Sequence, residues 1–320
     1  MSPTSSSFPE VLTVTLNPAI DETAFVEKLA PGAVHRATGF HRQAGGKGIN
    51  VAAMLADAGH RVGVTGFLGT ENPRVFDSFF RDRGLEDLFI RLFGATRTGI
   101  KLVDAATQQT TDVNLPGLEP SPADLERLGE VLARHASPDT WVVIAGSLPP
   151  GVEPVHLKAL IGAVKKARAS VAVDTSGPAL RAAVEAGVDF LKPNRAELAE
   201  LTGRKIDGFA AALEAAAGLR RKGVAHVVVS LGHEGALFLN PERNLIAAAP
   251  SVEVVSTVGA GDSLLAGYLS GLLRRQPIEA RARTATVFAW CALESIDRTL
   301  VPEVERAARA ETISLQPLPE

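Results

Sequence analysis

The chain has 320 residues, of which 46% are hydrophobic and 22% are charged, and its formal net charge is −3. This length fits one large α/β domain or two small ones, with a sizeable core. A charge so close to neutral gives no strong attraction to nucleic acid or to an anionic membrane, so neither is expected as a partner.

Residues 11–16 are apolar and rich in β-branched side chains, which predicts a buried strand. The segment Asn17-Pro-Ala-Ile-Asp21 follows it directly. Open α/β sheets bind ligands at the carboxyl ends of their strands, so Asp21 could accept hydrogen bonds from ligand hydroxyls. The alternative is that Asn17 and Pro18 only form an Asx-type turn, with no functional role.

The segment Gly45-Gly-Lys-Gly-Ile-Asn50 precedes a helical pattern of apolar residues. Glycines before a helix allow a ligand to approach the backbone closely. Lys47 adds a positive charge, and Asn50 adds an amide that can donate and accept hydrogen bonds. The segment is not a Walker loop, because Gly-x-x-x-x-Gly-Lys-Ser/Thr does not occur in the chain.

Three loosely alternating segments interrupt the order of strands and helices: residues 33–43, 98–103 and 110–115. We expect them to form a small separate sheet that acts as a lid, built from approximately residues 22–43 and 96–115. An exposed sheet edge can pair with a second chain, so the lid could join two copies into a homodimer. Arg97, in the lid, could hold a phosphate in bidentate fashion, although a solvated surface arginine is the commoner role.

From residue 121 onward, helical and strand patterns take turns regularly. A helix is predicted over residues 121–135. Strands are predicted at residues 140–145, 171–174, 190–191 and 227–230. This alternation predicts βαβ units and a parallel sheet. The expected fold class is α/β, with one domain over residues 1–320 and a mostly parallel central sheet flanked by helices.

Two of the predicted strand ends carry residues that could contact a ligand. Gly146-Ser-Leu-Pro-Pro-Gly151 places Ser147 after one strand, and Lys192-Pro-Asn-Arg-Ala-Glu197 follows another. The alternative for Asn194 and Glu197 is a capping box, because their spacing would satisfy backbone groups at the start of a helix without any ligand.

A β-branched run over residues 254–258 ends in Gly259-Ala-Gly-Asp262, and an apolar helical pattern follows, which predicts a strand, a glycine turn and the start of a helix. Gly259 and Gly261 can adopt positive φ angles and expose consecutive N–H groups, which form an anion site with the positive end of the helix dipole. A carboxylate repels a bound phosphate, so Asp262 is better suited to accept a proton from a hydroxyl that attacks phosphorus. The alternative is that Asp262 only caps the helix.

Two further helices are predicted over residues 264–273 and 279–295. The second contains the single cysteine of the chain, Cys291, which excludes an intramolecular disulfide and favours a packed core thiol. No apolar run is long enough to span a bilayer, and the first residues lack the pattern of a signal peptide. We therefore expect a cytoplasmic protein.

The string Gly-Ala-Gly-Asp after such a strand resembles the C-terminal signature of the ribokinase-like (PfkB) sugar kinases. Gly-Gly-Lys-Gly-Ile-Asn resembles the N-terminal signature of the same family, and Asn-x-x-Glu is a further motif in the expected order. In this family the aspartate is the catalytic base and the glycine turn is the anion hole. The resemblance therefore implies a ribokinase-like fold and assigns these two roles to four residues: Asp262, Gly259, Ala260 and Gly261.

The resemblance also implies which residues bind the ligands. Substrate contacts are implied at Asp21, Gly45, Gly46, Lys47, Asn50, Arg97, Ser147 and Asp262. Nucleotide contacts are implied at Lys192, Asn194, Ser230, Gly232, Gly235, Thr257, Gly259 and Gly261. Glu197 would help to place Mg²⁺ through water, because Mg²⁺ keeps much of its hydration. A monovalent cation, K⁺, would bind where relatives hold it, at Ser256, Val258 and Ser295.

The implied activity is the ATP-dependent phosphorylation of a phosphosugar. Leu-Asn-Pro-Ala-Ile-Asp and the N-terminal signature are similar to the branch of 1-phosphofructokinases and tagatose-6-phosphate kinases. We therefore expect fructose 1-phosphate as acceptor and fructose 1,6-bisphosphate as product, with tagatose 6-phosphate or fructose 6-phosphate as alternative acceptors. This branch usually has Arg-x-Asn where the chain has Arg97-Thr-Gly99. A sugar-phosphate-binding regulator without catalysis is the alternative from another class, but it would have no need of Asp262 as a base.

Overall fold

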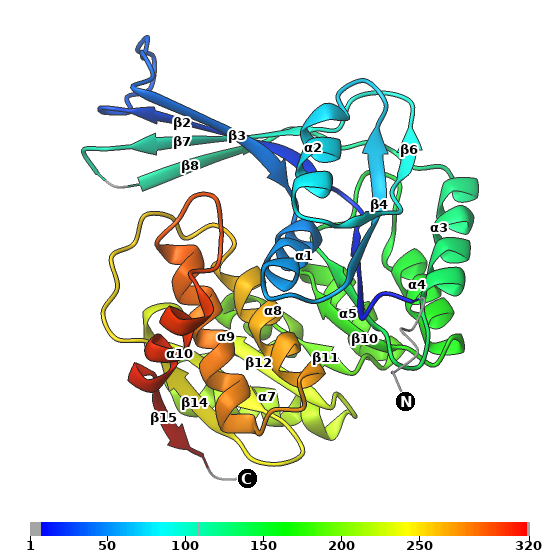
Figure 1. The fold of residues 1–320 in the computed structure, drawn as a ribbon, viewed down its shortest axis with the longest axis vertical. Coiled ribbons are helices and arrows are strands. Elements are labelled where there is room, and N and C mark those ends of the chain that lie inside the picture. The colour runs from blue at the N-terminus through cyan, green and yellow to red at the C-terminus, as the bar shows by residue number, and fades with distance from the viewer. Residues whose placement is uncertain (1–7, 108, 319–320) are drawn as a thin grey trace.

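The computed structural model describes residues 8–107 and 109–318, which form two sheets and the helices around them (Figure 1). Within these residues the larger sheet has eleven strands, in the order β15-β14-β13-β12-β11-β10-β9-β1-β4-β5, and β6 pairs with β4. The strands are β1 (Val11–Thr15), β4 (Val62–Gly69), β5 (Glu86–Asp87), β6 (Ile90–Leu92), β9 (Trp141–Ala145), β10 (Ser170–Asp174), β11 (Phe190–Leu191), β12 (His226–Ser230), β13 (Ala236–Leu239), β14 (Leu245–Ala248) and β15 (Ser314–Pro317). The pairs from β5 and β6 through to β12 are parallel, and those from β12 to β15 are antiparallel. The prediction of a mostly parallel central sheet is confirmed.

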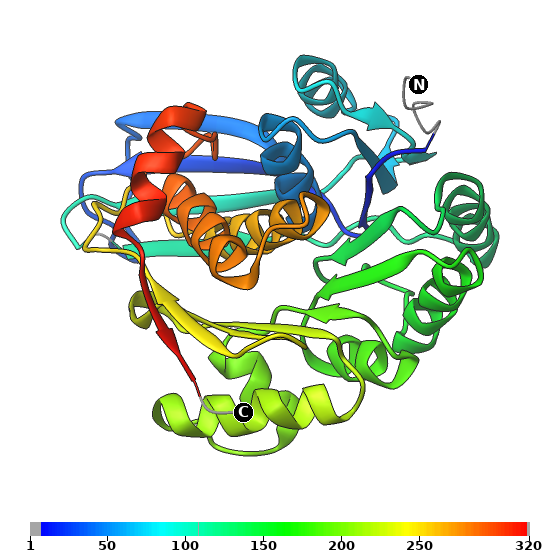
Figure 2. The same ribbon diagram turned by 60° about the horizontal axis from the view of Figure 1, so that its bottom comes forward.

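Helices cover both faces of this sheet (Figure 2). One face packs against α3 (Pro122–His135), α4 (Pro154–Lys166), α5 (Gly177–Ala186), α6 (Arg195–Thr202) and α7 (Gly208–Arg221). The other packs against α1 (Lys47–Asp57), α2 (Arg74–Asp82), α8 (Ala260–Leu273), α9 (Ile278–Leu293) and α10 (Glu303–Thr312). None of the helices in the described residues is both long and apolar enough to cross a membrane.

Strand β1 shows why the sequence forms this core. All five of its residues are buried. Leu12 and Val14 belong to the apolar cluster on one face of the sheet, and Val11 belongs to the cluster on the other. A strand covered on both faces needs a continuous apolar, β-branched run rather than a strict alternation, and residues 11–16 provide one.

The smaller sheet contains strands in the order β3-β2-β7-β8 and projects as an arm above α9 and α10 in Figure 1. Its strands are β2 (Ala19–Val26), β3 (Gly39–Gly45), β7 (Thr98–Asp104) and β8 (Gln109–Asn114). The predicted strands at 98–103 and 110–115 are found here. The predicted strand at 33–43 is wrong in its first part, because β3 begins only at Gly39.

Strand β2 was not predicted at all, because its buried face carries Asp21 and Thr23 and so hides the apolar alternation of a strand. The Asx-turn alternative for this region is wrong. Asn17 Oδ1 accepts no hydrogen bond from any described residue, and Asp21 lies inside β2. Asp21 lines a cavity together with residues at the carboxyl ends of the central strands, among them Asp174 and Lys192.

Candidate active site

Two cavities adjoin at the carboxyl ends of the central strands. The polar cavity, of about 500 Å³, is lined by acids and bases from both sheets and from the helix starts: Asp21, Lys47, Arg97, Asp174, Lys192, Glu197 and Asp262. The apolar cavity, of about 1180 Å³, lies beyond α8 and is lined by residues such as Val252, Leu264, Trp290 and Leu293. The two cavities share Asn194, Ser230 and Gly261 in their walls, so a ligand that fills one can reach the other.

The structure brings most of the predicted site residues to these two cavities. The predicted substrate residues in the wall of the polar cavity are Asp21, Gly46, Lys47, Asn50, Arg97, Ser147 and Asp262. The predicted nucleotide residues in the wall of the apolar cavity are Asn194, Ser230, Gly232, Gly235, Thr257 and Gly261. Lys192 and Gly259 line the polar cavity instead. Gly45 lies beside Asp21, where a Cβ would come within 2.6 Å of the carboxyl carbon, so glycine leaves room for that acid.

Asp262 lies in the first turn of α8 and is 6% exposed. The N-cap of this helix is Gly259, so the alternative in which Asp262 caps the helix is wrong. Asn50 Nδ2 donates a hydrogen bond to Asp262 Oδ2 over 2.7 Å. Burial raises the pKa of Asp262, and the negative charge of Asp174 raises it further, more than the nearby lysines lower it. A carboxylate with a raised pKa is suited to accept a proton.

The start of α8 is suited to bind an anion. Gly259 adopts a left-handed conformation, with φ of 82°, and its side of the helix has no side-chain cap. The first backbone N–H groups of an α-helix have no partner within the helix, and the helix dipole places positive charge there. Gly261, in the same turn, is part of both cavities. The backbone around Ala260 can therefore hold negative charge at the point where the cavities meet.

Lys47 is the first residue of α1, and its Nζ lies 3.2 Å from Asp174 Oδ1 and 4.0 Å from Glu197 Oε1. Burial lowers the pKa of Lys47, but the charges of Asp174, Asp262 and Glu197 together raise it well above its usual value. On the other side, Asp174 Oδ2 lies 3.3 Å from Lys192 Nζ. The lysine stays protonated over the whole physiological range and can offer its charge to an anionic ligand.

Asp21 is held between two cations that the sequence did not single out. Lys101 Nζ lies 2.8 Å from Asp21 Oδ1, and Arg298 Nη2 lies 3.3 Å from Asp21 Oδ2. Arg97 is half-buried, not solvated, and donates hydrogen bonds to Asn114 Oδ1 over 3.1 Å and to the backbone oxygen of Asn17 over 3.2 Å. Near the small sheet, the side chains of Asp21 and Arg97 are therefore held in place by ion pairs and hydrogen bonds.

Gly99 pairs with Asn114 across β7 and β8. A Cβ at Gly99 would lie 3.1 Å from Asp21 Oδ1 and 3.6 Å from Asn114 Oδ1. The amide that the Arg-x-Asn pattern would place on β7 is thus matched by an amide on the neighbouring strand β8. Because Gly99 has no side chain, it leaves room for the polar groups of Asp21 and Asn114.

The capping-box interpretation of Asn194 and Glu197 is confirmed. Glu197 N donates to Asn194 Oδ1 over 2.9 Å, and Asn194 N donates to Glu197 Oε2 over 2.8 Å. The other carboxylate oxygen of Glu197 is the one that lies 4.0 Å from Lys47 Nζ. The cap fixes the carboxylate and leaves one oxygen for the polar cavity, so the structural and the functional interpretation are compatible.

Among the proposed cation residues, Val258 lines the polar cavity. The predicted strand over residues 254–258 is wrong, because these residues form a loop. This loop is held at the end of α9, where Val255 N and Ser256 N both donate to the backbone oxygen of Leu293, over 2.8 and 3.1 Å. Ser295 is two residues further on. The loop before α8 and the turn after α9 therefore lie together.

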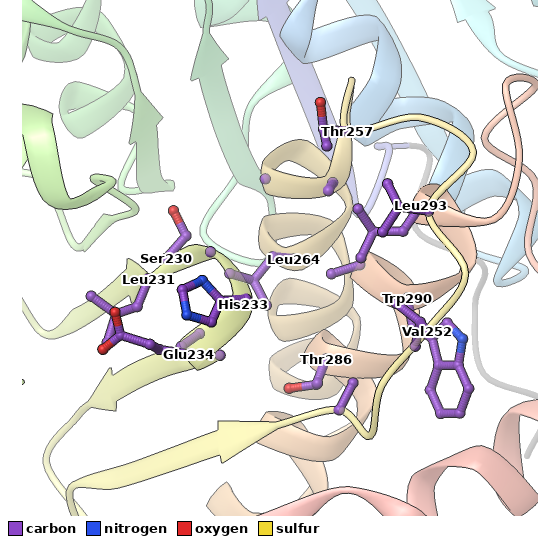
Figure 3. Close-up of a pocket in the computed structure, with 18 of the residues that line it drawn as sticks. Ser230, Leu231, His233, Glu234, Val252, Thr257, Leu264, Thr286, Trp290 and Leu293 are labelled. Atoms are coloured by element: carbon purple, nitrogen blue, oxygen red, sulfur yellow. The ribbon is translucent and has the colours of Figure 1, made fainter. Parts of the chain in front are cut away.

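Figure 3 shows the apolar cavity, with the residues after β12 on one side of Leu264 and with Leu293, Trp290 and Val252 on the other. Sequence reasoning did not single out the individual residues of this apolar wall, because apolar residues on a helix such as α9 also form core. Cys291, in the same helix, is such a core residue: it is 2% exposed, and the prediction of a packed thiol is confirmed. Asp174 was also missed, although an acid at the end of a buried strand was a usable signal.

Comparison with known proteins places this geometry in a family. The pfkB family of carbohydrate kinases matches residues 14–302. The chain is 44% identical to 1-phosphofructokinase of Xanthomonas campestris pv. campestris over 310 residues, covering 95% of this chain and 98% of that protein. It is 40% identical to 1-phosphofructokinase of Escherichia coli K12 over 309 residues, covering 96% and 98%.

Solved structures of phosphofructokinase-2 from Escherichia coli, with fructose 6-phosphate and with potassium, superpose with a TM-score of 0.87 at 28% identity, covering 95% of this chain and 98% of that one. A tetrameric inhibited form of the same protein superposes with a TM-score of 0.85. The chain therefore belongs to the pfkB family of carbohydrate kinases, and it is an ATP-dependent sugar-phosphate kinase.

Proposed function

We propose that the enzyme transfers the γ-phosphoryl group of ATP to the 6-hydroxyl of fructose 1-phosphate and forms fructose 1,6-bisphosphate. The observation that carries this proposal is one polar cavity that holds a buried acid, Asp262, together with the cations Lys47 and Arg97. A phosphorylated acceptor needs such cations, and an attacking hydroxyl needs such an acid. The full-length identity of 40 to 44% to 1-phosphofructokinases supports fructose 1-phosphate as the acceptor.

Each cavity takes one substrate. The adenosine of ATP occupies the apolar cavity, and its phosphates extend past Ser230 and Asn194 to the start of α8, where the two cavities meet. The phosphosugar occupies the polar cavity. Asp21 accepts hydrogen bonds from its hydroxyls, and Asn50 can both donate and accept them, which orients the ring.

Arg97 and Lys47 hold the phosphate that the sugar already carries. Arginine offers a planar set of donors that matches phosphate, and lysine adds a point charge. Lys192, which is 4% exposed and lies in the polar cavity, faces the nucleotide phosphates where the cavities join. Together these cations counter the repulsion between the two anionic substrates.

The chemical step is an in-line displacement. Asp262 accepts the proton of the 6-hydroxyl as its oxygen bonds to the γ-phosphorus, and the bond from phosphorus to the β-phosphate oxygen breaks to release ADP. The backbone N–H groups from Gly259 to Gly261 and the positive end of α8 stabilise the negative charge on the transferred group. Burial of Asp262 keeps competing water away from the base.

The residues present fit a magnesium ion held mainly by ATP and water. No group of three or more histidine, cysteine, aspartate or glutamate side chains in the described residues is arranged to hold a metal ion directly. The Glu197 oxygen outside the capping box faces the polar cavity, 4.0 Å from Lys47 Nζ, which suits a contact through water. When bound, Mg²⁺ neutralises charge on the phosphates. The hydrogen bonds from Val255 N and Ser256 N to the backbone oxygen of Leu293 hold the loop of Ser256 beside the turn of Ser295, which supports K⁺ as a second ion there.

The small sheet is the lid of this site, over approximately residues 22–43 and 96–115. It carries Asp21 and Arg97 into the polar cavity, so its movement opens and closes access to the phosphosugar. All residues of its outer strand β8 are exposed, and within the described residues β8 pairs only with β7, so its other edge supports a homodimer formed through the lid. The protein is proposed to work in the cytoplasm, where ATP is available.

The experiment is an assay of ADP release with fructose 1-phosphate, tagatose 6-phosphate and fructose 6-phosphate, with a sample without sugar as control. The largest kcat/KM is expected for fructose 1-phosphate. A larger value for fructose 6-phosphate would favour that second acceptor, for which the solved complex of the Escherichia coli relative is the supporting observation. Binding of all three sugars without ADP release would contradict the proposal and indicate a sugar-phosphate-binding regulator.

A further inference from the structure

Arg298 lies in the turn between α9 and α10, and only 6% of its side chain is exposed. Its backbone has a φ of 51°, in the left-handed region that residues with a side chain rarely adopt. A buried arginine in an unfavourable backbone conformation is kept only where its contacts hold it there. Arg298 lies behind the polar cavity, whose wall is formed in front of it by Asp21 and Asn50.

The guanidinium group of Arg298 contacts both of these residues. Nη1 donates to Asn50 Oδ1, and Nη2 donates to Asp21 Oδ2 over 3.3 Å. The other end of the Asn50 amide, Nδ2, donates to Asp262 Oδ2 over 2.7 Å. A guanidinium group can only donate, and an ionised carboxylate can only accept, so the amide between them has one orientation.

The stem of Arg298 also contacts the element that carries the base. A Cβ on Gly259 would lie 2.6 Å from Arg298 Cδ, so the stem packs directly on the glycine turn that begins α8. The turn that holds Arg298 is fixed to the small sheet, because Gln43 Nε2 donates to the backbone oxygen of Ile296 over 3.3 Å. The arginine is thus held from its own turn, from the glycine turn and from the small sheet.

We propose that Arg298 is a positioning residue for Asp262, which acts by holding the Asn50 amide with its nitrogen, and not its oxygen, toward the base. Without the guanidinium group, the Asn50 amide is free to rotate and to present Oδ1 to the carboxylate. An oxygen there repels the ionised form of Asp262 and accepts a hydrogen bond from its protonated form. The inference rests on the proposed function of Asp262 as the base.

The other charged groups that face Asp262 are Asp174, Lys47 and Lys192, from β10, α1 and the loop after β11. Asp174 is held by its pairs with Lys47 and Lys192, so we expect all three to stay in place when Arg298 is changed. Loss of the Asn50 donor removes a contact that lowers the pKa of Asp262, so that pKa rises further. Activity needs the ionised carboxylate, so the acid limb of the pH profile of kcat should move to higher pH.

The test is the pH profile of kcat for Arg298→Met, in which turnover is measured as ADP release with ATP and fructose 1-phosphate. We expect kcat at neutral pH to fall by roughly tenfold or more, as for a lost hydrogen bond to a charged group, and the acid limb to move to higher pH. The KM for ATP should stay within about twofold, because the substitution is not expected to change the interactions that ATP makes equally in the ground state and in the transition state. Arg298→Lys, which keeps a charged donor, should recover part of the lost kcat. An acid limb that stays at its wild-type position in Arg298→Met contradicts the proposal.

A double-mutant cycle with Asn50→Leu tests whether Arg298 acts through the amide. Asn50→Leu alone must shift the acid limb upward, and Arg298→Met must add no further shift in that background. Two shifts that add in full would contradict the proposal. An unshifted limb in Asn50→Leu would do so as well, even if no variant at position 298 folds.

The matched control is Arg83→Met. Arg83 Nη2 donates to the backbone oxygen of Asp297 over 3.5 Å, and Nη1 pairs with Asp57 over 2.8 Å, so it supports the same turn without touching Asn50. This variant should leave the acid limb in place; an equal shift would mean that the turn as a whole, and not Arg298, is responsible. If Asp262→Asn keeps its turnover, the proposed function fails. If Asp262→Asn loses turnover while Arg298→Met leaves the limb unmoved, only the present inference fails.

Discussion

The polar and the apolar cavity share a wall at the start of α8, but their side chains are held in different ways. In the polar cavity Asp174 lies between Lys47, at 3.2 Å, and Lys192, at 3.3 Å, and each charge depends on its neighbours. In the apolar cavity Trp290 and Val252 contribute contact area. Removal of one member of a buried charge network leaves another charge unpaired. Removal of one apolar contact loses only the free energy of that contact. Substitutions in the polar cavity should therefore have the larger effects.

The largest effect is expected for Asp262→Asn. The amide keeps the shape of the side chain but cannot accept the proton, so kcat should fall by about 10²- to 10⁴-fold, the usual range for loss of a general base. ATP should still bind with nearly unchanged affinity, because the apolar cavity is intact. Single-turnover ADP release and calorimetry of ATP binding measure the two quantities. Near-normal turnover would remove Asp262 from the mechanism.

A matched pair of substitutions separates the two cavities. Arg97→Met should raise the KM for the phosphosugar by roughly 10- to 100-fold, since hydrogen bonds to a charged phosphate are lost, and should leave the KM for ATP nearly unchanged. Trp290→Ala should do the reverse, with a KM for ATP raised by about tenfold or less, in line with a lost apolar contact. Steady-state kinetics with each substrate varied in turn checks both. If either variant raised both KM values equally, the division into two sites would be wrong.

A smaller effect, on pH dependence, is expected for Asp174→Asn. The charge of Asp174 raises the pKa of Asp262, which burial has already raised. Removal of that charge lowers the pKa of Asp262, so the base stays ionised in more acidic solution and the acid limb of kcat moves to lower pH. Asp207→Asn is the control, because that carboxylate is 68% exposed and belongs to a surface pair with Lys205. An acid limb that moves upward in Asp174→Asn would contradict the electrostatic account of this cavity.

The same contrast explains how much the sequence could predict. The glycine turns of the sequence pointed to Lys47, Asn50 and Asp262 as candidates, and the structure brings all three to the polar cavity. The central sheet was predicted for a similar reason: buried parallel strands are continuous apolar runs.

The remaining residues could not be predicted, because their roles depend on contacts between distant segments. Arg298 reaches Asn50 from a turn 248 positions later in the chain, and no local pattern marks it. Strand β2 was hidden because Asp21 and Thr23 are polar residues on its buried face. Trp290 and its apolar neighbours look like core until the fold leaves space beside them.

The most direct test of the account is an experimental structure of the enzyme with a non-hydrolysable ATP analogue and fructose 1-phosphate. We expect the adenine between Trp290 and Val252, the γ-phosphate at the start of α8, and the 6-hydroxyl within hydrogen-bond distance of Asp262. A nucleotide bound away from the apolar cavity, or a sugar whose 6-hydroxyl lies out of reach of Asp262, would contradict the claim that the two cavities form one active site.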